Sequence, residues 1–424
     1  MRIEPAPSFR GTFTLPGDKS ISHRAAILGA MAEDTTHVLN YSSAADCAST
    51  LACLRGLGVP VLEEGTSVAI HGRGPDAWHS PAAVLDAGNS GSTIRMLAGA
   101  LAGRPFRTTL TGDESLRRRP LERVAAPLRA MGATVETTGG KAPVAVTGGP
   151  LRGLVHELPV ASAQVKTAVL LAGLQAEGRT TVREPIPSRD HTERMLSAFG
   201  VTVERDGLAV TVAGGARLRG TTVVVPGDAS SAAFLVVAAL VLPDSEVRLE
   251  GVLLSPTRTA FLEVLRAMGG RIDTRFEQAE PEPVGTIVAS SSALVGTTID
   301  PALVPSLIDE VPALAVAGAF ASGELEITGA AELRYKESDR IAALATGLAA
   351  LGVRVRERPD GLVVEGGERL RGARVDSMDD HRIAMALSVA ALAAEGPSEI
   401  EHALCVSVSF PEFYAVLGRA TGRG

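Results

Sequence analysis

Residues 199–215 read FGVTVERDGLAVTVAGG, and this stretch decides the fold. It begins with a hydrophobic residue and a glycine that close a helical segment, and glycine suits the left-handed position just past a helix C-terminus because it has no Cβ. Residues of period two then flank a D-G turn, which predicts two strands joined as a hairpin. The stretch therefore predicts one α/β unit, a helix followed by a β-hairpin.

The same unit recurs along the chain. Hairpin patterns also occupy 59–74, 134–149, 270–291 and 353–367. A hydrophobic residue followed by a helix-ending glycine recurs six times, at intervals of 66 to 83 residues, at Gly58, Gly132, Gly200, Gly269, Gly352 and Gly418. This period is too long for a solenoid repeat, so we predict six copies of a β-α unit packed into compact bodies.

A longer repeat predicts two domains. P-G-D-K-S at 16–20 and P-G-D-A-S at 226–230 lie 210 residues apart, which is the length of three units. A chain of 424 residues also exceeds what one hydrophobic core usually organises. We therefore expect a discontinuous first domain, 1–17 plus 228–424, and a second domain, 18–227. A ligand site in the cleft between them is the corresponding expectation.

Composition excludes several classes of function. The net charge of −7 argues against a broad nucleic-acid-binding surface. The three cysteines lack metal-type spacing, so neither a disulfide framework nor a zinc site is expected. The N-terminus has no apolar signal segment, and the longest apolar run, 232–242, is far shorter than the roughly 20 residues that span a bilayer. We expect a cytoplasmic protein without a membrane partner.

Lysine is scarce, and its positions suggest chemistry. Only four of the 41 basic residues are lysines, namely Lys19, Lys141, Lys166 and Lys336. Because arginine serves wherever a surface cation is enough, a retained lysine suggests a compact ammonium that a planar guanidinium cannot replace. Lys19 and Lys336 lie in strongly polar cassettes, which is the first indication of a catalytic site.

The first cassettes indicate anion binding at helix starts. G-D-K-S-I-S-H-R at 17–24 places cations and hydroxyls before an apolar helix, a good anion cradle, although a solvated helix cap would also explain it. It is not a phosphate loop, because Asp18 precedes the lysine. In G-N-S-G-S-T-I-R at 88–95, glycine allows close approach of a ligand or simply forms a turn. Of the arginines in R-R-R-P at 117–120, Arg119 is the best placed to be fixed, whereas such runs are usually solvated.

Later cassettes add hydroxyl, amide and carboxylate groups. Ser162 and Gln164 in S-A-Q, and Arg189 in S-R-D at 188–190, lie at expected helix starts, where capping explains Ser162 and Asp190 equally well. Asp309 and Glu310 open an apolar helix, so they are candidates for a general base or for helix capping.

The cassette K-E-S-D-R at 336–340 has the strongest internal logic. If it begins a helix, Lys336 and Arg340 share one face, with Glu337 and Asp339 beside them. Two cations on one face repel each other unless an anion lies between them. Arg382 in D-H-R at 380–382 lies at another helix start. These clusters, spread over both halves, predict convergence on a pair of anionic substrates.

The joint order and spacing of these cassettes closely resemble the 5-enolpyruvylshikimate-3-phosphate synthase family of enolpyruvyl transferases over essentially the whole chain. The resemblance implies an α/β fold of two similar domains, each an inside-out α/β barrel of three β-α units, with the active site in the interdomain cleft. It implies transfer of the enolpyruvyl group of phosphoenolpyruvate to the 5-hydroxyl of shikimate 3-phosphate, by addition and elimination through a tetrahedral intermediate that releases phosphate. It also implies a monomer without metal or organic cofactor.

The resemblance implies roles for individual residues. Asp309 would accept the hydroxyl proton, Glu337 and Lys336 would move protons at C3, and Lys19 would serve both substrates. Shikimate 3-phosphate would be bound by Lys19, Ser20, Arg24, Ser162, Ala163, Gln164, Arg189, Asp309 and Lys336. Phosphoenolpyruvate would be bound by Lys19, Gly91, Arg119, Gln164, Glu337, Arg340 and Arg382.

Two departures and two alternatives qualify this reading. Ala163 stands where many relatives have a second serine, and Val408 stands where many have a lysine that binds phosphoenolpyruvate. Gly91 leaves room for glyphosate, so inhibition is expected. A sister enolpyruvyl transferase acting on UDP-N-acetylglucosamine would have a G-x-K-N opening and a loop cysteine, neither of which stands here. A non-catalytic anion-binding protein of the same fold would not need an acid and a base beside its cations.

Overall fold

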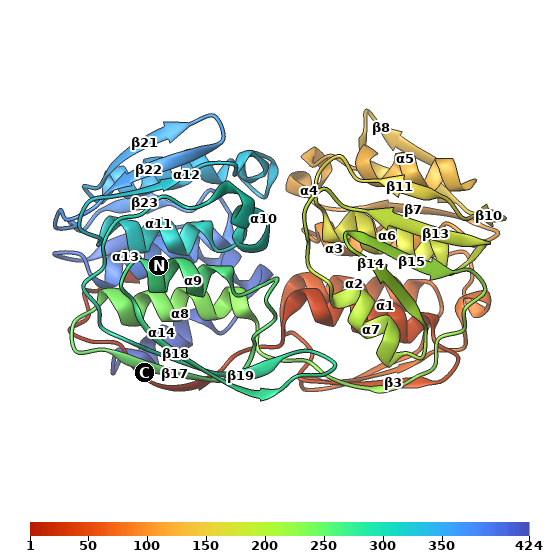
Figure 1. The fold of residues 1–424 in the computed structure, drawn as a ribbon, viewed down its shortest axis with the longest axis horizontal. Coiled ribbons are helices and arrows are strands. Elements are labelled where there is room, and N and C mark those ends of the chain that lie inside the picture. The colour runs from red at the N-terminus through yellow and green to blue at the C-terminus, as the bar shows by residue number, and fades with distance from the viewer. Residues whose placement is uncertain (424) are drawn as a thin grey trace. The chain divides into compact units, whose positions relative to one another are not determined.

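The computed structural model describes residues 1–423, which form two compact units (Figure 1). Unit 1 consists of Met1–Pro16 together with the chain from Pro226 onward, and unit 2 is Gly17–Val225. Both units combine buried helices with small sheets of mostly antiparallel hairpins. The predicted α/β class is confirmed.

Unit 2 contains three four-stranded sheets and one two-stranded sheet. In spatial order, the first is β16 (Thr222–Val224), β3 (Thr35–Leu39), β5 (Ser67–His71) and β4 (Val61–Glu64); the second is β6 (Leu85–Asp86), β7 (Arg107–Thr111), β9 (Lys141–Thr147) and β8 (Thr134–Thr138); the third is β11 (Val155–Glu157), β13 (Arg179–Arg183), β15 (Ala209–Ala213) and β14 (Val203–Asp206); the small sheet is β10 (Leu151–Arg152) and β12 (Ala176–Glu177). Its helices are α1 (Lys19–Met31), α2 (Ala45–Gly56), α3 (Gly91–Leu101), α4 (Glu114–Arg118), α5 (Glu122–Met131), α6 (Ala163–Gly173) and α7 (His191–Ala198).

Unit 1 contains three sheets. In spatial order, the first is β18 (Arg271–Gln278), β19 (Val284–Ser290), β17 (Glu246–Leu253) and β2 (Arg10–Thr14); the second is β20 (Glu324–Ile327), β22 (Gly361–Glu365) and β21 (Arg354–Arg358); the third is β1 (Arg2–Ile3), β24 (Ser398–Glu401) and β23 (Arg374–Asp376). Its helices are α8 (Ala229–Val241), α9 (Ala260–Ala267), α10 (Val304–Leu307), α11 (Val311–Ala319), α12 (Arg340–Ala350), α13 (His381–Leu392) and α14 (Phe413–Ala420).

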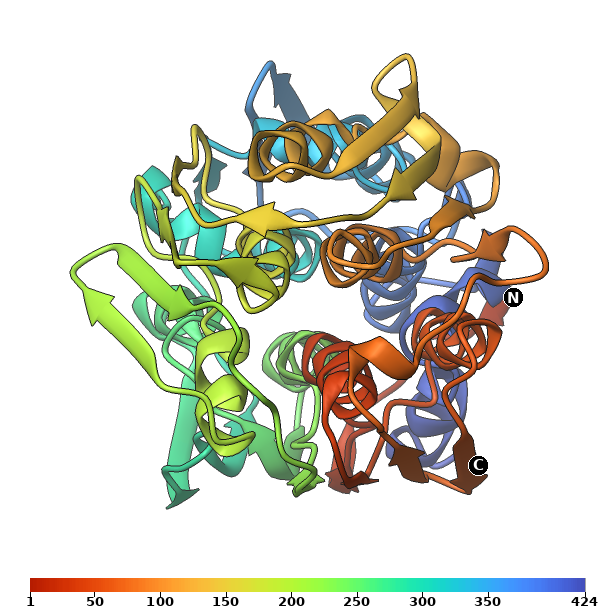
Figure 2. The same cartoon turned by 90° about the vertical axis from the view of Figure 1, so that its right-hand side faces the viewer.

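Three helices form the core of each unit. In unit 2, α3 packs against both α1 and α6, and Figure 2 shows these three nearly end-on in red, orange and yellow. In unit 1, α8, α11 and α13 pack against one another. Each of the six is buried along most of its length because its sequence is apolar or small on nearly every face, as in ASSAAFLVVAALV of α8. The hairpins pack around them with one face exposed.

The helix-ending glycines are confirmed at five of the six predicted positions. Gly58, Gly132, Gly200, Gly269 and Gly352 all have positive φ, between 83° and 116°. The prediction for Gly418 is wrong, because this residue lies inside α14, which continues to Ala420. The positive φ falls instead at Gly422.

The two P-G-D corners lie where the chain passes from one unit to the other. In each corner the aspartate caps the next helix, since Oδ1 of Asp18 accepts from the Ile21 amide at 2.9 Å and Oδ1 of Asp228 accepts from the Ser231 amide at 3.0 Å. At Gly17 a Cβ would lie 1.9 Å from the carbonyl oxygen of Asn40, so only glycine fits there. Close packing therefore leaves no room for a side chain at this position of the first corner.

The structure bears on three of the composition-based exclusions. All three cysteines are free thiols, and Cys47 and Cys53 are buried. Within residues 1–423 no cluster of three or more histidine, cysteine, aspartate or glutamate residues has a geometry that could hold a metal ion. In the same range no single helix is long and apolar enough to cross a membrane, while one pair bent by 115°, Pro301–Leu307 with Val311–Ala319, passes by length and composition alone.

Candidate active site

The starts of α1, α3 and α6 lie close together in unit 2. From α1, Nη2 of Arg24 donates to the Ala163 carbonyl at the start of α6 at 3.5 Å, and the Gln164 amide donates to Oγ of Ser92 on α3 at 2.9 Å. Every helix start leaves N–H groups unpaired and carries a partial positive charge. Three such ends in one place make a site that attracts anions before any side chain is counted.

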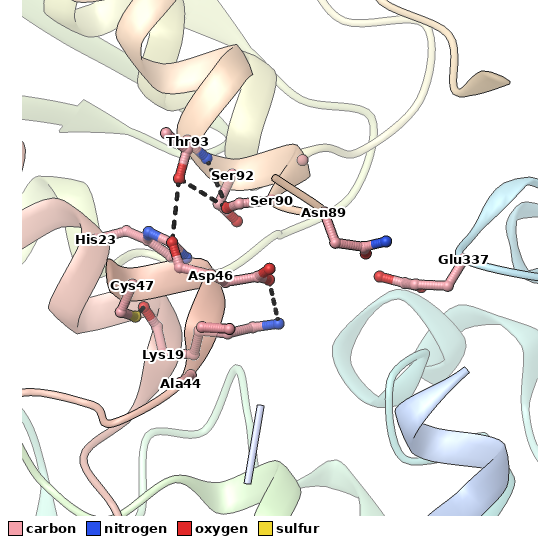
Figure 3. Close-up of polar contacts among 12 residues, drawn as sticks. Lys19, His23, Ala44, Asp46, Cys47, Asn89, Ser90, Ser92, Thr93 and Glu337 are labelled. Carbon is pink, nitrogen blue, oxygen red and sulfur yellow. Dashed lines mark hydrogen bonds and ion pairs between the residues drawn. The ribbon is translucent and has the colours of Figure 1, made fainter. Parts of the chain in front are cut away.

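Lys19 is held at the first of these helix starts by an ion pair. Its Nζ lies 2.8 Å from Oδ2 of Asp46 on α2, and the two side chains are 17% and 7% exposed (Figure 3). The Asp46 backbone is tied in turn to α3, because the hydroxyl of Thr93 lies 3.4 Å from the Asp46 carbonyl oxygen and 2.7 Å from Oγ of Ser90 (Figure 3). The ammonium is therefore fixed by a carboxylate that is itself fixed.

A neutral histidine braces the same region. Nδ1 of His23 lies 2.7 Å from the hydroxyl of Thr50, which lies 2.6 Å from that of Thr93. Burial lowers the pKa of His23 well below its usual value, and the charges of Lys19 and Arg24 lower it further. At neutral pH the imidazole therefore adds no positive charge. It serves to join α1, α2 and α3.

Arg24 is buried and donates from each of its nitrogens to protein oxygens. Nε donates to the Thr192 hydroxyl at 2.8 Å, Nη2 to the Thr167 hydroxyl at 2.9 Å, and Nη1 to the Ser20 carbonyl at 2.8 Å. Arg24 thus joins α1 to both α6 and α7. Arg24 therefore places a positive charge near the helix starts. Its hydrogen bonds also hold these helices together.

Arg119 is fixed, as expected from the proline that follows it. Its Nη2 donates to Oδ1 of Asn89 at 2.6 Å and to Oγ of Ser115 at 3.0 Å, whereas Arg117 and Arg118 are exposed. The guanidinium therefore lies against the loop that opens α3. The alternative interpretation, that the arginine run is solvated, is right for Arg117 and Arg118 and wrong for Arg119.

Arg95 is a site residue that the sequence did not identify. It is buried, and its Nη1 donates to Oε1 of Gln164 at 2.8 Å and to the Gly91 carbonyl at 3.3 Å. Its Nη2 donates to the Pro120 carbonyl at 3.2 Å, next to Arg119. Arg95 therefore joins two predicted site positions, Gly91 and Gln164, and contacts the neighbour of a third, Arg119. Arg95 ends the cassette G-N-S-G-S-T-I-R, but nothing in the sequence indicates the direction of its side chain.

The polar group at the start of α6 and the segment before α7 meet α1. The Ser162 hydroxyl accepts from the Val165 amide at 3.4 Å, which confirms the predicted cap. Asp190 makes no such cap, and that prediction is wrong, because Arg194 and Arg205 donate to its Oδ2 at 2.9 and 3.3 Å. Arg189, beside it, donates to the hydroxyl of Ser20 at 3.4 Å.

In unit 1 the carboxylate of Asp309 lies among three cations. Oδ1 of Asp309 is 3.8 Å from Nζ of Lys336 and 3.6 Å from Nη1 of Arg340. Its Oδ2 is 3.8 Å from Nη2 of Arg382, whose Nη1 donates to the Asp309 carbonyl at 2.9 Å. Glu337 completes the group, since its Oε2 accepts from Arg340 at 2.6 Å. The structure therefore brings together five predicted residues from three separate cassettes.

The local structure around Lys336 differs from the expectation. Helix α12 begins at Arg340, capped by Asp339, whose Oδ1 accepts from the Ala342 amide at 3.1 Å. Lys336 lies before it, where the short 3-10 helix Ala331–Tyr335 ends. The predicted i,i+4 pair is wrong because aspartate at the cap position is the stronger start signal. The anion expected between the two cations is nevertheless present, as the carboxylate of Asp309.

The electrostatics of this cluster favour proton transfer. Burial lowers the pKa of the Lys336 ammonium below its usual value, Asp309 opposes the shift, and Arg340 adds to it. Arg340 itself stays charged, because its carboxylate partners outweigh the effect of burial and raise its pKa. An amine with a lowered pKa beside a carboxylate and a fixed cation is a suitable acid–base group.

A second network under Asp309 was not predicted. Glu310 is fully buried and does not cap α11 with its side chain; instead it accepts from the hydroxyl of Ser230 at the start of α8. Arg258, also buried, donates to that hydroxyl at 2.9 Å. The capping alternative is therefore wrong for Glu310. With Arg382 bonded to Asp309, the starts of α8, α11 and α13 meet in unit 1 as their counterparts do in unit 2.

The two departures from the resembled family are Ala163 and Val408. The Ala163 carbonyl already accepts from the Thr167 hydroxyl at 2.6 Å. Val408 ends the 3-10 helix Ala403–Val408 and is half-buried. Neither position places a side-chain charge in the clusters described above.

Comparisons with known proteins agree over the whole chain. The profile of the EPSP synthase family, 3-phosphoshikimate 1-carboxyvinyltransferase, matches residues 3–417. The 3-phosphoshikimate 1-carboxyvinyltransferase of Desulforudis audaxviator is 51% identical over 417 residues, 97% of each chain, and that of Solibacter usitatus is 50% identical over 420 residues, 99% of each.

Solved structures are similar as well. EPSP synthase from Acinetobacter baumannii superposes with a TM-score of 0.87 at 44% identity, covering 99% of this chain and 98% of that one. The enolpyruvyl transferase NikO from Streptomyces tendae gives a TM-score of 0.80, covering 99% of this chain and 96% of that one. At 19% identity the second likeness speaks for the fold alone.

Proposed function

Since the chain belongs to the EPSP synthase (3-phosphoshikimate 1-carboxyvinyltransferase) family, we propose that its two helix-start clusters bind the two anionic substrates of that reaction and carry out its proton transfers. The chain is a transferase of the shikimate pathway, which leads to the aromatic amino acids, and its substrates are phosphoenolpyruvate and shikimate 3-phosphate. What is proposed is the assignment of residues to steps.

Both clusters are needed for one reaction. Unit 2 offers cations, hydroxyls and three helix starts, but its carboxylate nearest to Lys19, Asp46, is already paired with that ammonium. Unit 1 offers Asp309 with Lys336 and Glu337, which can move protons. We therefore propose one shared site, in keeping with the interdomain cleft and the inside-out α/β barrels that the sequence resemblance implies. Monomeric state and cytoplasmic location stay predictions.

In the proposed addition step, Asp309 accepts the proton of the 5-hydroxyl as its oxygen bonds to C2 of phosphoenolpyruvate. Glu337 or Lys336 delivers a proton to C3, which becomes a methyl group. In the elimination step C3 returns that proton, the bond from C2 to the phosphate oxygen breaks, and the double bond re-forms. Cations that hold the phosphate also stabilise it as it leaves.

One observation carries this proposal, the contact of the Asp309 carboxylate with three cations. The three cations lie where they can attract an anionic substrate to the one group among them that can accept the hydroxyl proton. A site for binding alone would gain nothing from placing a negative charge among the cations that must hold an anion.

The first test uses the pH dependence of catalysis. Because its pKa is lowered, Lys336 loses its proton and its charge at a pH below that of an ordinary lysine. Since kcat/KM reports ionisations of the free enzyme, kcat/KM for shikimate 3-phosphate should fall on the alkaline side in that range. In Lys336→Arg the charge persists, so the alkaline fall should move to higher pH. An unchanged alkaline limb in Lys336→Arg would remove Lys336 from this role.

The second test concerns Gly91. A Cβ at this position would lie 2.5 Å from Nη1 of Arg95, which holds Gln164. Gly91→Ala should therefore displace the Arg95 guanidinium and raise the KM for phosphoenolpyruvate about 10-fold, since small misplacements near reacting groups are costly. The wild-type enzyme should be inhibited by glyphosate near its phosphoenolpyruvate KM, and the variant much less. Gly149→Ala, at a glycine with open space around it, is the matched control.

A further inference from the structure

Lys166 is the most deeply buried of the four lysines, and the reaction does not use it. Its side chain is 2% exposed, and its Nζ lies 2.7 Å from Oε2 of Glu184 and 2.7 Å from Oε1 of Glu193. Those carboxylates are 5% and 2% exposed. Burying three charges is unfavourable unless the geometry is well made. A lysine in this position, in a chain that otherwise prefers arginine, is therefore a built feature.

The three charges join three separate segments of unit 2. Lys166 lies in the first turn of α6, two residues after Gln164. Glu184 follows β13, and Glu193 lies in the first turn of α7. A compact ammonium can direct its donors to two carboxylates at once, whereas a planar guanidinium would need more space and another geometry.

Glu184 extends the link to the neighbour of Arg189. Its Oε2 bonds Lys166, and its Oε1 accepts from the hydroxyl of Ser188. Between these two residues the sequence is P-I-P, and both prolines restrict the backbone. The segment 184–188 is thus pinned at both of its ends by one side chain. Arg189 follows directly and reaches Ser20 on α1.

A parallel link runs beside the charges. The hydroxyls of Thr167 on α6 and Thr192 on α7 lie 2.6 Å apart, and Arg24 donates to both. The start of α6, the start of α7 and the segment before α7 are therefore held in one arrangement. These are the segments that carry Ser162, Gln164 and Arg189.

We propose that Lys166, acting through Glu184 and Ser188, is a positioning residue for shikimate 3-phosphate binding. Lys166 fixes the distance between Arg189 and the start of α6. The groups that bind shikimate 3-phosphate are therefore correctly positioned before the substrate binds. The proposal rests on the assignment of Arg189, Ser162 and Gln164 to shikimate 3-phosphate. A purely structural ion cluster would stabilise unit 2 without favouring one substrate.

The mildest variant is Ser188→Ala, which removes one hydroxyl and no charge. It should weaken binding of shikimate 3-phosphate, measured by calorimetry on the wild-type and variant enzymes, about 10-fold, the effect of one hydrogen bond to a charged group. The KM for phosphoenolpyruvate should change less, because Gln164 is the one group proposed for that substrate that lies in a segment held by this link. Ser67→Ala, at an exposed position on β5, is the matched control.

Lys166→Met should give the larger effect of the same kind, with binding of shikimate 3-phosphate weakened at least about 10-fold and binding of phosphoenolpyruvate weakened less. If it leaves the carboxylates too costly for folding, Lys166→Met with Glu184→Gln and Glu193→Gln removes the charges at nearly constant volume. Lys141→Met, at an exposed lysine on β9, controls for the substitution itself. A folded Lys166 variant that binds both substrates like wild type would overturn the proposal.

A double-mutant cycle separates this proposal from the assignment beneath it. If Ser188 acts through Arg189, the effect of Ser188→Ala should vanish in an Arg189→Ala background. Arg189→Ala without effect on shikimate 3-phosphate would mean that the site assignment is wrong. Arg189→Ala with a large effect, while Ser188→Ala and the Lys166 variants have none, would refute only the positioning role. Additive effects of Ser188→Ala and Arg189→Ala would refute it as well.

Discussion

Asp309→Ala should reduce kcat about 1,000-fold, the usual contribution of a general base. The KM for phosphoenolpyruvate should not rise, because Lys336 and Arg382 lose a competing carboxylate and remain available to the anion. Steady-state kinetics with each substrate varied in turn would measure both effects. The combination of a lower kcat with an equal or lower KM is the signature of a group used in the chemical step.

Asp309→Asn refines this prediction. The amide keeps the shape of the side chain but cannot accept the proton, so its kcat should be nearly as low as that of the alanine variant. Asp206→Ala, at an exposed hairpin position, should behave like wild type. If Asp309→Ala raised KM while kcat stayed near normal, Asp309 would be a binding group and the proposed base would have to be sought elsewhere.

Lys19→Met should lower kcat/KM for both substrates by about 100- to 1,000-fold, the loss of more than one hydrogen bond between charged groups. The reason is twofold. The variant loses a cation at the start of α1, and it leaves the carboxylate of Asp46, which is nearly buried, without its 2.8 Å partner. That negative charge, no longer offset by the ammonium, would repel both anionic substrates.

The double variant Lys19→Met with Asp46→Asn tests the second reason. Removing the negative charge of Asp46 should recover part of the lost kcat/KM, because only the missing cation then remains. Lys141→Met supplies the control for a lysine-to-methionine change at an exposed site. A loss confined to one substrate would contradict the placement of Lys19 between the two.

The fold was predictable because its signals are local. Alternating residues around D-G turns are sufficient to form a hairpin, and the structure has antiparallel pairs at each of the predicted places, such as β14 with β15 and β21 with β22. The left-handed conformation of a helix-ending glycine is likewise a property of its own local backbone. The prediction for Gly418 was wrong because α14 continues past this residue to Ala420.

The candidate site was predictable in its members but not in its connections. Motif order brought Asp309, Lys336, Glu337, Arg340 and Arg382 to attention, and the structure places them in contact. It could not be read from the sequence that Arg95 turns toward Gln164, or that Glu310 turns away from its helix toward Ser230. Both depend on tertiary packing between helices far apart in the chain.

The most direct measurement is release of inorganic phosphate by the purified protein with phosphoenolpyruvate and shikimate 3-phosphate, run beside phosphoenolpyruvate and UDP-N-acetylglucosamine. The proposed site predicts release with shikimate 3-phosphate only, and loss of that release in both Asp309→Ala and Lys336→Met. Release with the sugar nucleotide instead, or undiminished release in the two variants, would contradict the assignment of enolpyruvyl transfer to these residues.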